Sequence, residues 1–165
     1  MKLETSAARV WKRLTRDEKL AGARHFWADP PRDAVGPAQA AVVQTLRVRP
    51  QTVRTLDPER KAAALASAGD IGEVLAASLL VALHLGERRA LMAAFLDGAG
   101  LVHDNGMLPD EPSPPPIEEG SARRGYEAVS KSFPEDPVRT YLNTLWLQDH
   151  DRWAVLDQVV TEPRQ

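Results

Sequence analysis

The chain has 165 residues, 43% of them hydrophobic and 27% charged, which is typical of one globular domain with enough apolar side chains for a core. Lys and Arg number 21 and Asp and Glu 23, giving a formal charge of -2, so a strongly basic protein is excluded and any affinity for nucleic acid needs a local patch. The absence of cysteine excludes disulfides, thiolate metal sites and cysteine nucleophiles, and it favours a cytoplasmic location.

The N-terminal segment MKLETSAARVWKRLTRDEK carries a charge every few residues and has no apolar run, so a secretory signal is not expected. The most apolar window is 74–86, bounded by Glu73 and Glu87. It is shorter than the roughly 20 residues that a membrane-spanning helix needs. The window therefore predicts a buried core helix, and we expect no membrane partner.

Helix start signals recur along the chain. The segments TRDE (15–18) and DIGE (70–73) have the spacing of capping boxes. The Asp-Pro pairs at 57–58 and 136–137 place an N-cap residue directly before a proline, which fits the first turn of a helix. With the Gly and Pro breaks, these signals predict helices at about 6–14, 16–28, 37–48, 58–67, 71–86, 88–98, 121–132, 137–149 and 151–160.

The apolar residues repeat with the period of a helix. Val138, Leu142 and Leu145 share one helix face, and no alternating strand pattern competes. The predicted fold is all-α, an irregular multi-helix bundle of short helices. Residues 14–21 resemble residues 56–63, and the offset of about 42 residues leaves HEAT-like helical hairpins as an alternative arrangement.

The Asn105-Gly106 pair is a strong signal for a tight turn, because both residues accept positive φ. Apolar residues flank it on both sides, so we expect a tiny hairpin near 101–108 that tucks Leu101, Val102, Met107 and Leu108 against the helix ends. His103 is then a polar flank of the turn.

Proline and acidic residues dominate the segment 109–120 and predict a semi-extended spacer. It separates a helical body, residues 1–108, from a C-terminal helical arm, residues 121–165. The arm is too short for a secure core of its own, so its aromatic stripe is expected to pack on the body or on a partner. The candidate partner-binding residues are Tyr141, Leu145, Trp146 and Trp153.

Basic residues concentrate between residues 9 and 61. If they face one way they form a phosphate-binding surface, although interspersed acids reduce its field. The candidate nucleic-acid-binding residues are Arg9, Lys12, Arg13, Arg16, Arg47, Arg49 and Arg54.

The sequence contains few indications of a catalytic or metal-binding function. The four histidines form no H-x-x-x-H pair, and nucleophile elbows and phosphate-binding glycine loops are missing. A helical enzyme or metal protein would have to use His103 with Asp104, and His150, which stands between two aspartates. A tight turn and a polar helix joint account for the same residues, so we assign no catalytic residue, metal or cofactor.

The preferred hypothesis is a non-catalytic interaction or regulatory module that binds another protein or self-associates. Nucleic-acid binding through residues 9–61 is the second hypothesis, and a helical enzyme or metal protein is the third.

Overall fold

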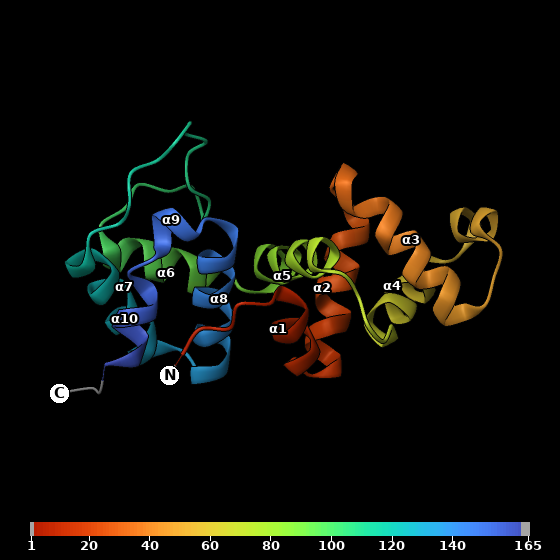
Figure 1. Cartoon of the computed structure of the whole chain (residues 1–165), viewed down its shortest axis with the longest axis horizontal. Helices are drawn as coiled ribbons and strands as arrows, with labels where there is room; N and C mark the ends of the chain where they lie inside the picture. The colour runs from red at the N-terminus through yellow and green to blue at the C-terminus, as the bar shows by residue number, and fades with distance from the viewer. Residues whose placement is uncertain (1, 163–165) are drawn as a thin grey trace. The chain divides into compact units, whose positions relative to one another are not determined.

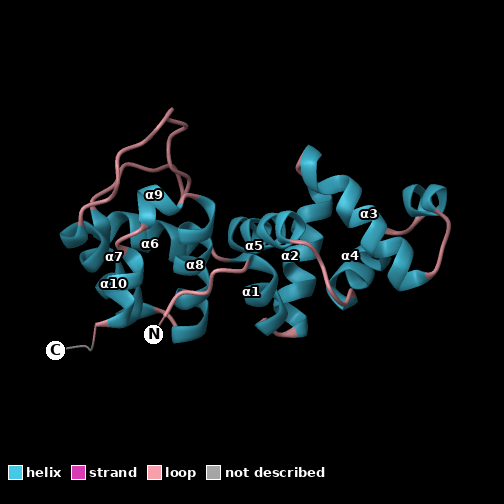
Figure 2. Ribbon diagram, viewed as in Figure 1, coloured by secondary structure: helices cyan, strands magenta, loops and turns pink. Residues whose placement is uncertain are grey.

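The computed structural model describes residues 2–162, and these residues form ten α-helices and one 3-10 helix without a strand (Figures 1 and 2). The predicted all-α fold is therefore confirmed. The chain divides into two compact units. Unit 2 is Ser6–Glu87, and unit 1 consists of the described residues of Met1–Thr5 and Arg88–Gln165. The sequence-based division, with breaks at 108 and 120, places the boundary elsewhere.

Unit 2 is built around one apolar helix. Its elements are α1 (Ala7–Arg13), α2 (Arg16–Ala28), α3 (Arg32–Leu46), the 3-10 helix η1 (Pro50–Thr55), α4 (Pro58–Ser67) and α5 (Glu73–Glu87). Helix α5 contacts α1, α2 and α3, and its Leu79, Leu80 and Leu83 are buried. Three helices thus pack against one central helix. This arrangement is an irregular bundle and not a stack of HEAT-like hairpins.

Two helices of unit 2, α1 and α2, have a local side-chain cap, from Ser6 and Thr15, whereas α3 and α4 have none. Thr15 and Glu18 form the predicted capping box of α2. Glu73 does not cap its own helix with Asp70, as the sequence suggested. Its carboxylate instead accepts hydrogen bonds from the Ser6 hydroxyl and the Ala7 N–H, the latter at 2.8 Å. Glu73 therefore caps α1, a partner 66 residues away in the sequence.

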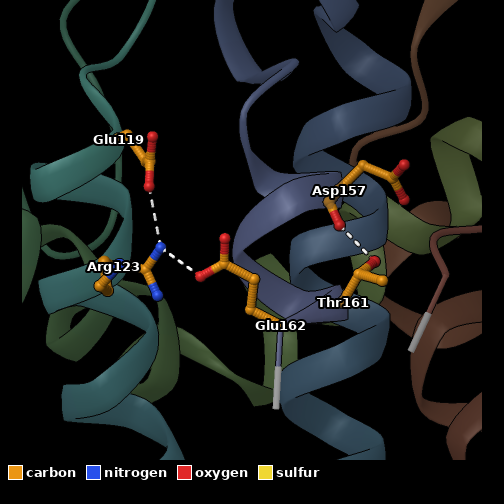
Figure 3. Close-up of polar contacts among 5 residues, drawn as sticks. All are labelled: Glu119, Arg123, Asp157, Thr161 and Glu162. Atoms are coloured by element: carbon orange, nitrogen blue, oxygen red, sulfur yellow. Dashed lines mark hydrogen bonds and ion pairs between the residues drawn. The ribbon is translucent and has the colours of Figure 1, made fainter. Parts of the chain in front are cut away.

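Unit 1 contains α6 (Arg89–Ala99), α7 (Glu119–Ser132), α8 (Glu135–Gln148), α9 (His150–Trp153) and α10 (Leu156–Thr161). Helices α6 and α7 approach closely at Gly125. A Cβ added there would lie 2.8 Å from the carbonyl oxygen of Phe95 and 2.8 Å from its ring. Figure 3 shows the Arg123 guanidinium of α7 between Glu119 and Glu162, at 2.8 and 2.6 Å.

The N-terminal residues are attached to unit 1 by hydrogen bonds of their backbone groups. The buried Asn143 amide of α8 accepts a hydrogen bond from the Glu4 N–H at 2.8 Å and donates one to the Glu4 carbonyl at 2.7 Å. The Leu3 N–H donates to Asp157 at 3.1 Å, and the Leu3 side chain is buried. Residues at the two ends of the described chain are therefore held in one unit.

Three predicted elements differ from the observed ones. Helix α3 begins at Arg32 instead of 37, with Pro37 inside it, and η1 was not predicted. The helix expected at 151–160 is two short helices, α9 and α10. Asp136 was expected as an N-cap, but Pro134 has that position and α8 begins at Glu135.

Candidate functional site

The aromatic stripe of the C-terminal arm is part of the core of unit 1. Tyr141, Leu145 and Trp153 are buried, and Trp146 is half-buried. The Phe95 ring of α6 lies 5.7 Å from the Tyr141 ring and 6.1 Å from the Trp153 ring. Burial raises the pKa of the Tyr141 hydroxyl. Tyr141, Leu145 and Trp153 pack within the unit, whereas Trp146 keeps part of its surface exposed.

The exposed surface of unit 1 includes a tight turn after α6. Asn105 and Gly106 have φ of 47° and 87°, and Asp104 and Met107 exchange two backbone hydrogen bonds of 2.8 and 2.9 Å. These are the features of a two-residue hairpin turn with positive φ at both central positions. The tiny hairpin predicted near 101–108 is thus confirmed. It consists of one antiparallel β-bridge, between Asp104 and Met107.

His103 fastens this turn to α6. Its Nδ1 accepts a hydrogen bond from the Gly106 N–H at 3.0 Å, so Nδ1 carries no hydrogen in this arrangement. The hydrogen then resides on Nε2, which donates to the Asp97 carboxylate at 2.8 Å. Both ring nitrogens are engaged, and the ring is only 11% exposed. His103 therefore has a structural role in holding the turn, and neither ring nitrogen has a free lone pair with which to bind a metal or a substrate.

Two further contacts hold the turn on α6. The Arg89 guanidinium donates to the Asn105 carbonyl at 3.2 Å. A Cβ added to Gly106 would lie 2.7 Å from the Met92 Cβ, so the turn backbone lies directly on the helix. The roles of Arg89, Met92 and Asp97 were not predicted from the sequence. The available signal was a His that follows an Asp by six positions across a glycine-rich helix end, a spacing too common to indicate a contact by itself.

Val102 and Met107 face away from α6. They are 81% and 44% exposed, and Val74 of unit 2, at 53%, is the other large hydrophobic residue exposed among the described residues. The expectation that the turn would bury Val102 and Met107 is wrong. Successive side chains of extended backbone point in opposite directions, and their neighbours His103 and Gly106 occupy the side that faces α6.

The chain then forms a long exposed segment between α6 and α7. Residues 109–116 are almost all exposed, and the loop extends away from α6 and α9 within unit 1 (Figure 1). The segment returns to the helices where the Ile117 N–H donates to the Arg152 carbonyl at 2.9 Å. We call residues 101–118 the acidic loop, because they contain four Asp and Glu and no Lys or Arg.

The other residues of the chemical hypothesis do not converge on His103. Asp104 is exposed at the turn, and His150 is exposed with its ring 4.5 Å from that of Trp146. Among the described residues, no three His, Cys, Asp or Glu side chains are arranged to hold a metal ion. The residue types that suggested chemistry are thus separate in the structure.

The basic residues of the nucleic-acid hypothesis are all at the surface of unit 2. The exposed residues are Arg9, Lys12, Arg13, Arg16, Arg47, Arg49 and Arg54. The first four lie on α1 and at the start of α2, where Asp17 and Glu18 are also present. The last three lie on α3's C-cap, before η1 and within η1.

In the part of the chain that the structure describes, no helix has both the length and the hydropathy needed to cross a bilayer. No family model, curated protein or solved structure matches the chain, so its function has to be argued from its own residues.

Proposed function

We propose that the protein is a non-catalytic cytoplasmic interaction or regulatory module that binds a partner protein through the acidic loop of unit 1. The observation that carries the proposal is the exposure of Val102 and Met107 on a turn that three contacts fix to α6. Isolated exposed hydrophobic residues are ordinary, but two of them on one anchored turn are typical of a binding epitope.

The anchoring matters because binding costs entropy. A flexible loop loses conformational freedom when a partner orders it, and a loop that is already fixed loses less. His103 and Arg89 satisfy the turn from the side of α6, so the outer side is free to make contacts. Loops held by a rigid helical scaffold are common sites of recognition.

The charge of the loop defines the partner's chemistry. Residues 101–118 contain four acids and no Lys or Arg, so the acidic loop itself carries negative charge, while Arg89 of α6 contributes one guanidinium at the turn. A complementary partner has an apolar pocket for these two side chains, with Lys and Arg around its rim. Electrostatic attraction would then speed association and weaken with salt.

The non-catalytic part of the proposal is supported by the bonding of His103. Both of its ring nitrogens have partners within the turn and α6, and neither Asp104 nor His150, both exposed, is one of these partners. A general acid or base needs a nitrogen or oxygen that can reach a substrate.

The test compares two sets of exposed hydrophobic residues. Tagged wild type, the double variant Val102→Ser/Met107→Ser and the control Val74→Ser are expressed in the native host, and co-purifying proteins are quantified by mass spectrometry after cross-linking. We expect one protein to be enriched with wild type and Val74→Ser and lost with the double variant. Equal recovery with all three baits would refute the proposal.

A second copy of the chain is the other occupant to consider. Light scattering of the purified protein at low salt measures this directly. A dimer that the double variant dissolves would assign the loop to self-association, whereas a monomer at all concentrations leaves a different protein as the partner.

A further inference from the structure

The connection between α3 and α4 in unit 2 has an unusual charge pattern. Residues 34–56 contain three arginines, Arg47, Arg49 and Arg54, and no Asp or Glu. All three are exposed. We call residues 47–55 the arginine loop. It is the opposite of the first two helices of unit 2, where acids accompany the basic residues.

The arginine loop has a defined backbone. The Thr52 N–H donates to the Arg49 carbonyl at 3.0 Å, and the Leu56 N–H donates to the Val53 carbonyl at 3.4 Å. Val53 is buried, and η1 packs against α3. Arg47 ends α3 with φ of 54°, a conformation that Gly or Asn adopts more readily. The three guanidinium groups are therefore attached to a folded segment, and its ordering does not have to accompany binding.

The three arginines are not neutralised within the chain. No ion pair of the described residues includes Arg47, Arg49 or Arg54. Arg24 of the same unit is a contrast. It donates two hydrogen bonds of 2.9 Å to the Glu59 carboxylate, and this interaction holds the pKa of Glu59 below its ordinary value. An arginine in such a pair has to give up its carboxylate before it can bind another anion.

We propose that the arginine loop binds the sugar–phosphate backbone of a nucleic-acid duplex. Exposed guanidinium groups match phosphate oxygens in charge and geometry, and exposed Gln51 and Thr55 add neutral polar groups beside them. The sequence-based hypothesis assigned nucleic-acid binding to basic residues throughout 9–61, and the present proposal assigns it to residues 47–55 alone. It concerns a surface separate from the acidic loop and does not depend on the function proposed for that loop.

Three features of the segment favour this ligand over others. Residues 34–56 include no aromatic residue, so a platform for stacking unpaired bases is missing. The exposed hydrophobic residues of the described chain lie outside the arginine loop, so it lacks an apolar centre for a protein interface and apolar side chains to insert into a lipid surface. Contacts to phosphates alone fit a duplex bound without sequence preference.

The test uses the full chain and fluorescence anisotropy with labelled DNA and RNA duplexes of mixed sequence. The variant Arg47→Asn/Arg49→Gln/Arg54→Gln removes three positive charges, and Asn is chosen because it tolerates positive φ. The matched control Lys12→Gln/Arg13→Gln/Arg16→Gln removes three charges from α1 and the start of α2. Circular dichroism verifies that both variants stay folded.

We expect wild type to bind at about 50 mM salt and the control to bind nearly as well. The arginine-loop variant should bind at least about tenfold more weakly, and the slope of log K against log salt should fall by about 3. Absence of wild-type binding, or equal losses in the two variants, would overturn the proposal. Vesicles with anionic lipid form a further arm, and binding to vesicles without binding to either duplex would also overturn it.

Discussion

The arginine loop and the acidic loop are opposites in charge and in hydrophobic exposure. Residues 34–56 have three Arg without an acid, whereas residues 90–122 have six acids without a Lys or Arg. Their units follow the same trend: unit 2 has 12 Lys and Arg against 9 Asp and Glu, and the sequence of unit 1 has 9 against 14. The overall charge of -2 therefore conceals a unit with more basic than acidic residues and a unit with more acidic than basic residues.

The two loops also differ in how they are held. Backbone hydrogen bonds and the buried Val53 fix the arginine loop from within. The turn of the acidic loop also has backbone hydrogen bonds, between Asp104 and Met107, but side chains of His103 and Arg89 attach it to α6. We therefore expect the turn of the acidic loop to loosen when His103 is replaced. The predictions below compare contacts in the two units, and the last of them tests this turn.

The largest effect is expected at Gly125, where α7 crosses α6. A Cβ there would meet the Phe95 carbonyl oxygen and ring at 2.8 Å, and the helices have to separate to accommodate it. Gly125→Ala should lower the free energy of unfolding by about 3 kcal/mol. Gly120→Ala is the control, because the nearest atom to its Cβ is the Arg124 guanidinium at 3.6 Å. Urea denaturation compares them, and equal stabilities would contradict the close crossing.

Asn143→Ala should have the next largest effect. The substitution removes the two hydrogen bonds that the Asn143 side chain makes with the backbone N–H and carbonyl of Glu4. We expect the free energy of unfolding to fall by about 2 kcal/mol. Gln148→Ala, an exposed position on the same helix, is the control. Hydrogen exchange at the Glu4 amide should accelerate only in Asn143→Ala, and unchanged protection would show that Asn143 does not hold residues 2–4.

Glu73 gives unit 2 a pH dependence. Hydrogen bonds from the Ser6 hydroxyl, and then from the Ala7 and Ala8 amides, hold the pKa of Glu73 below its ordinary value of 4.5. Its stabilising contribution is therefore complete above pH 4.5 and is lost as the pH falls through the lower pKa of the folded state.

Glu73→Gln should cost about 1 kcal/mol at neutral pH, as a lost helix cap does. The difference from wild type should shrink below pH 4.5. Unfolding curves at a series of pH values measure it. A difference that stays constant with pH would mean that the charge of Glu73 is not what caps α1.

For His103→Ala we expect an effect on stability no larger than that of Glu73→Gln, at most about 1 kcal/mol, because only the attachment of one surface turn is lost. Exchange of the Gly106 amide should become faster, since its acceptor is the His103 ring. His150→Ala is the matched control. If both variants leave Gly106 exchange unchanged, the turn is fixed without His103 and the contrast between the loops disappears.

The sequence predicted those parts of the fold that depend on neighbouring residues. The bounds of α2 and α4 were predicted to the residue. Thr15 forms the capping box of α2, and α4 has Pro58 in its first turn, although Asp57 makes no side-chain cap. The Asn105-Gly106 turn was also predicted, since positive φ at both positions is a local requirement.

The parts that were not predicted depend on residues far apart in the chain. Asn143 binds Glu4 across 139 residues, and no pattern near either residue indicates the pairing. Glu73 had the correct spacing for its own helix but caps α1. The aromatic stripe of α8 was correctly read as one helix face, yet periodicity alone does not say whether α6 or another protein covers it.

The candidate site was predicted in location but not in character. His103 and its turn stood out in the sequence, but the role of Asp97 as acceptor of the His103 N–H required the structure. The exposure of Val102 was the reverse of the expectation. A tight turn orients its side chains by its register against the supporting helix, and the sequence of the turn does not contain that register.

The most direct test of the central claim is the recovery of a partner from the native host with wild type, Val102→Ser/Met107→Ser and Val74→Ser as baits. Our account predicts a partner that wild type and Val74→Ser retain equally and that the double variant loses. Full retention by the double variant, with its fold intact, would contradict the assignment of the acidic loop as the binding surface.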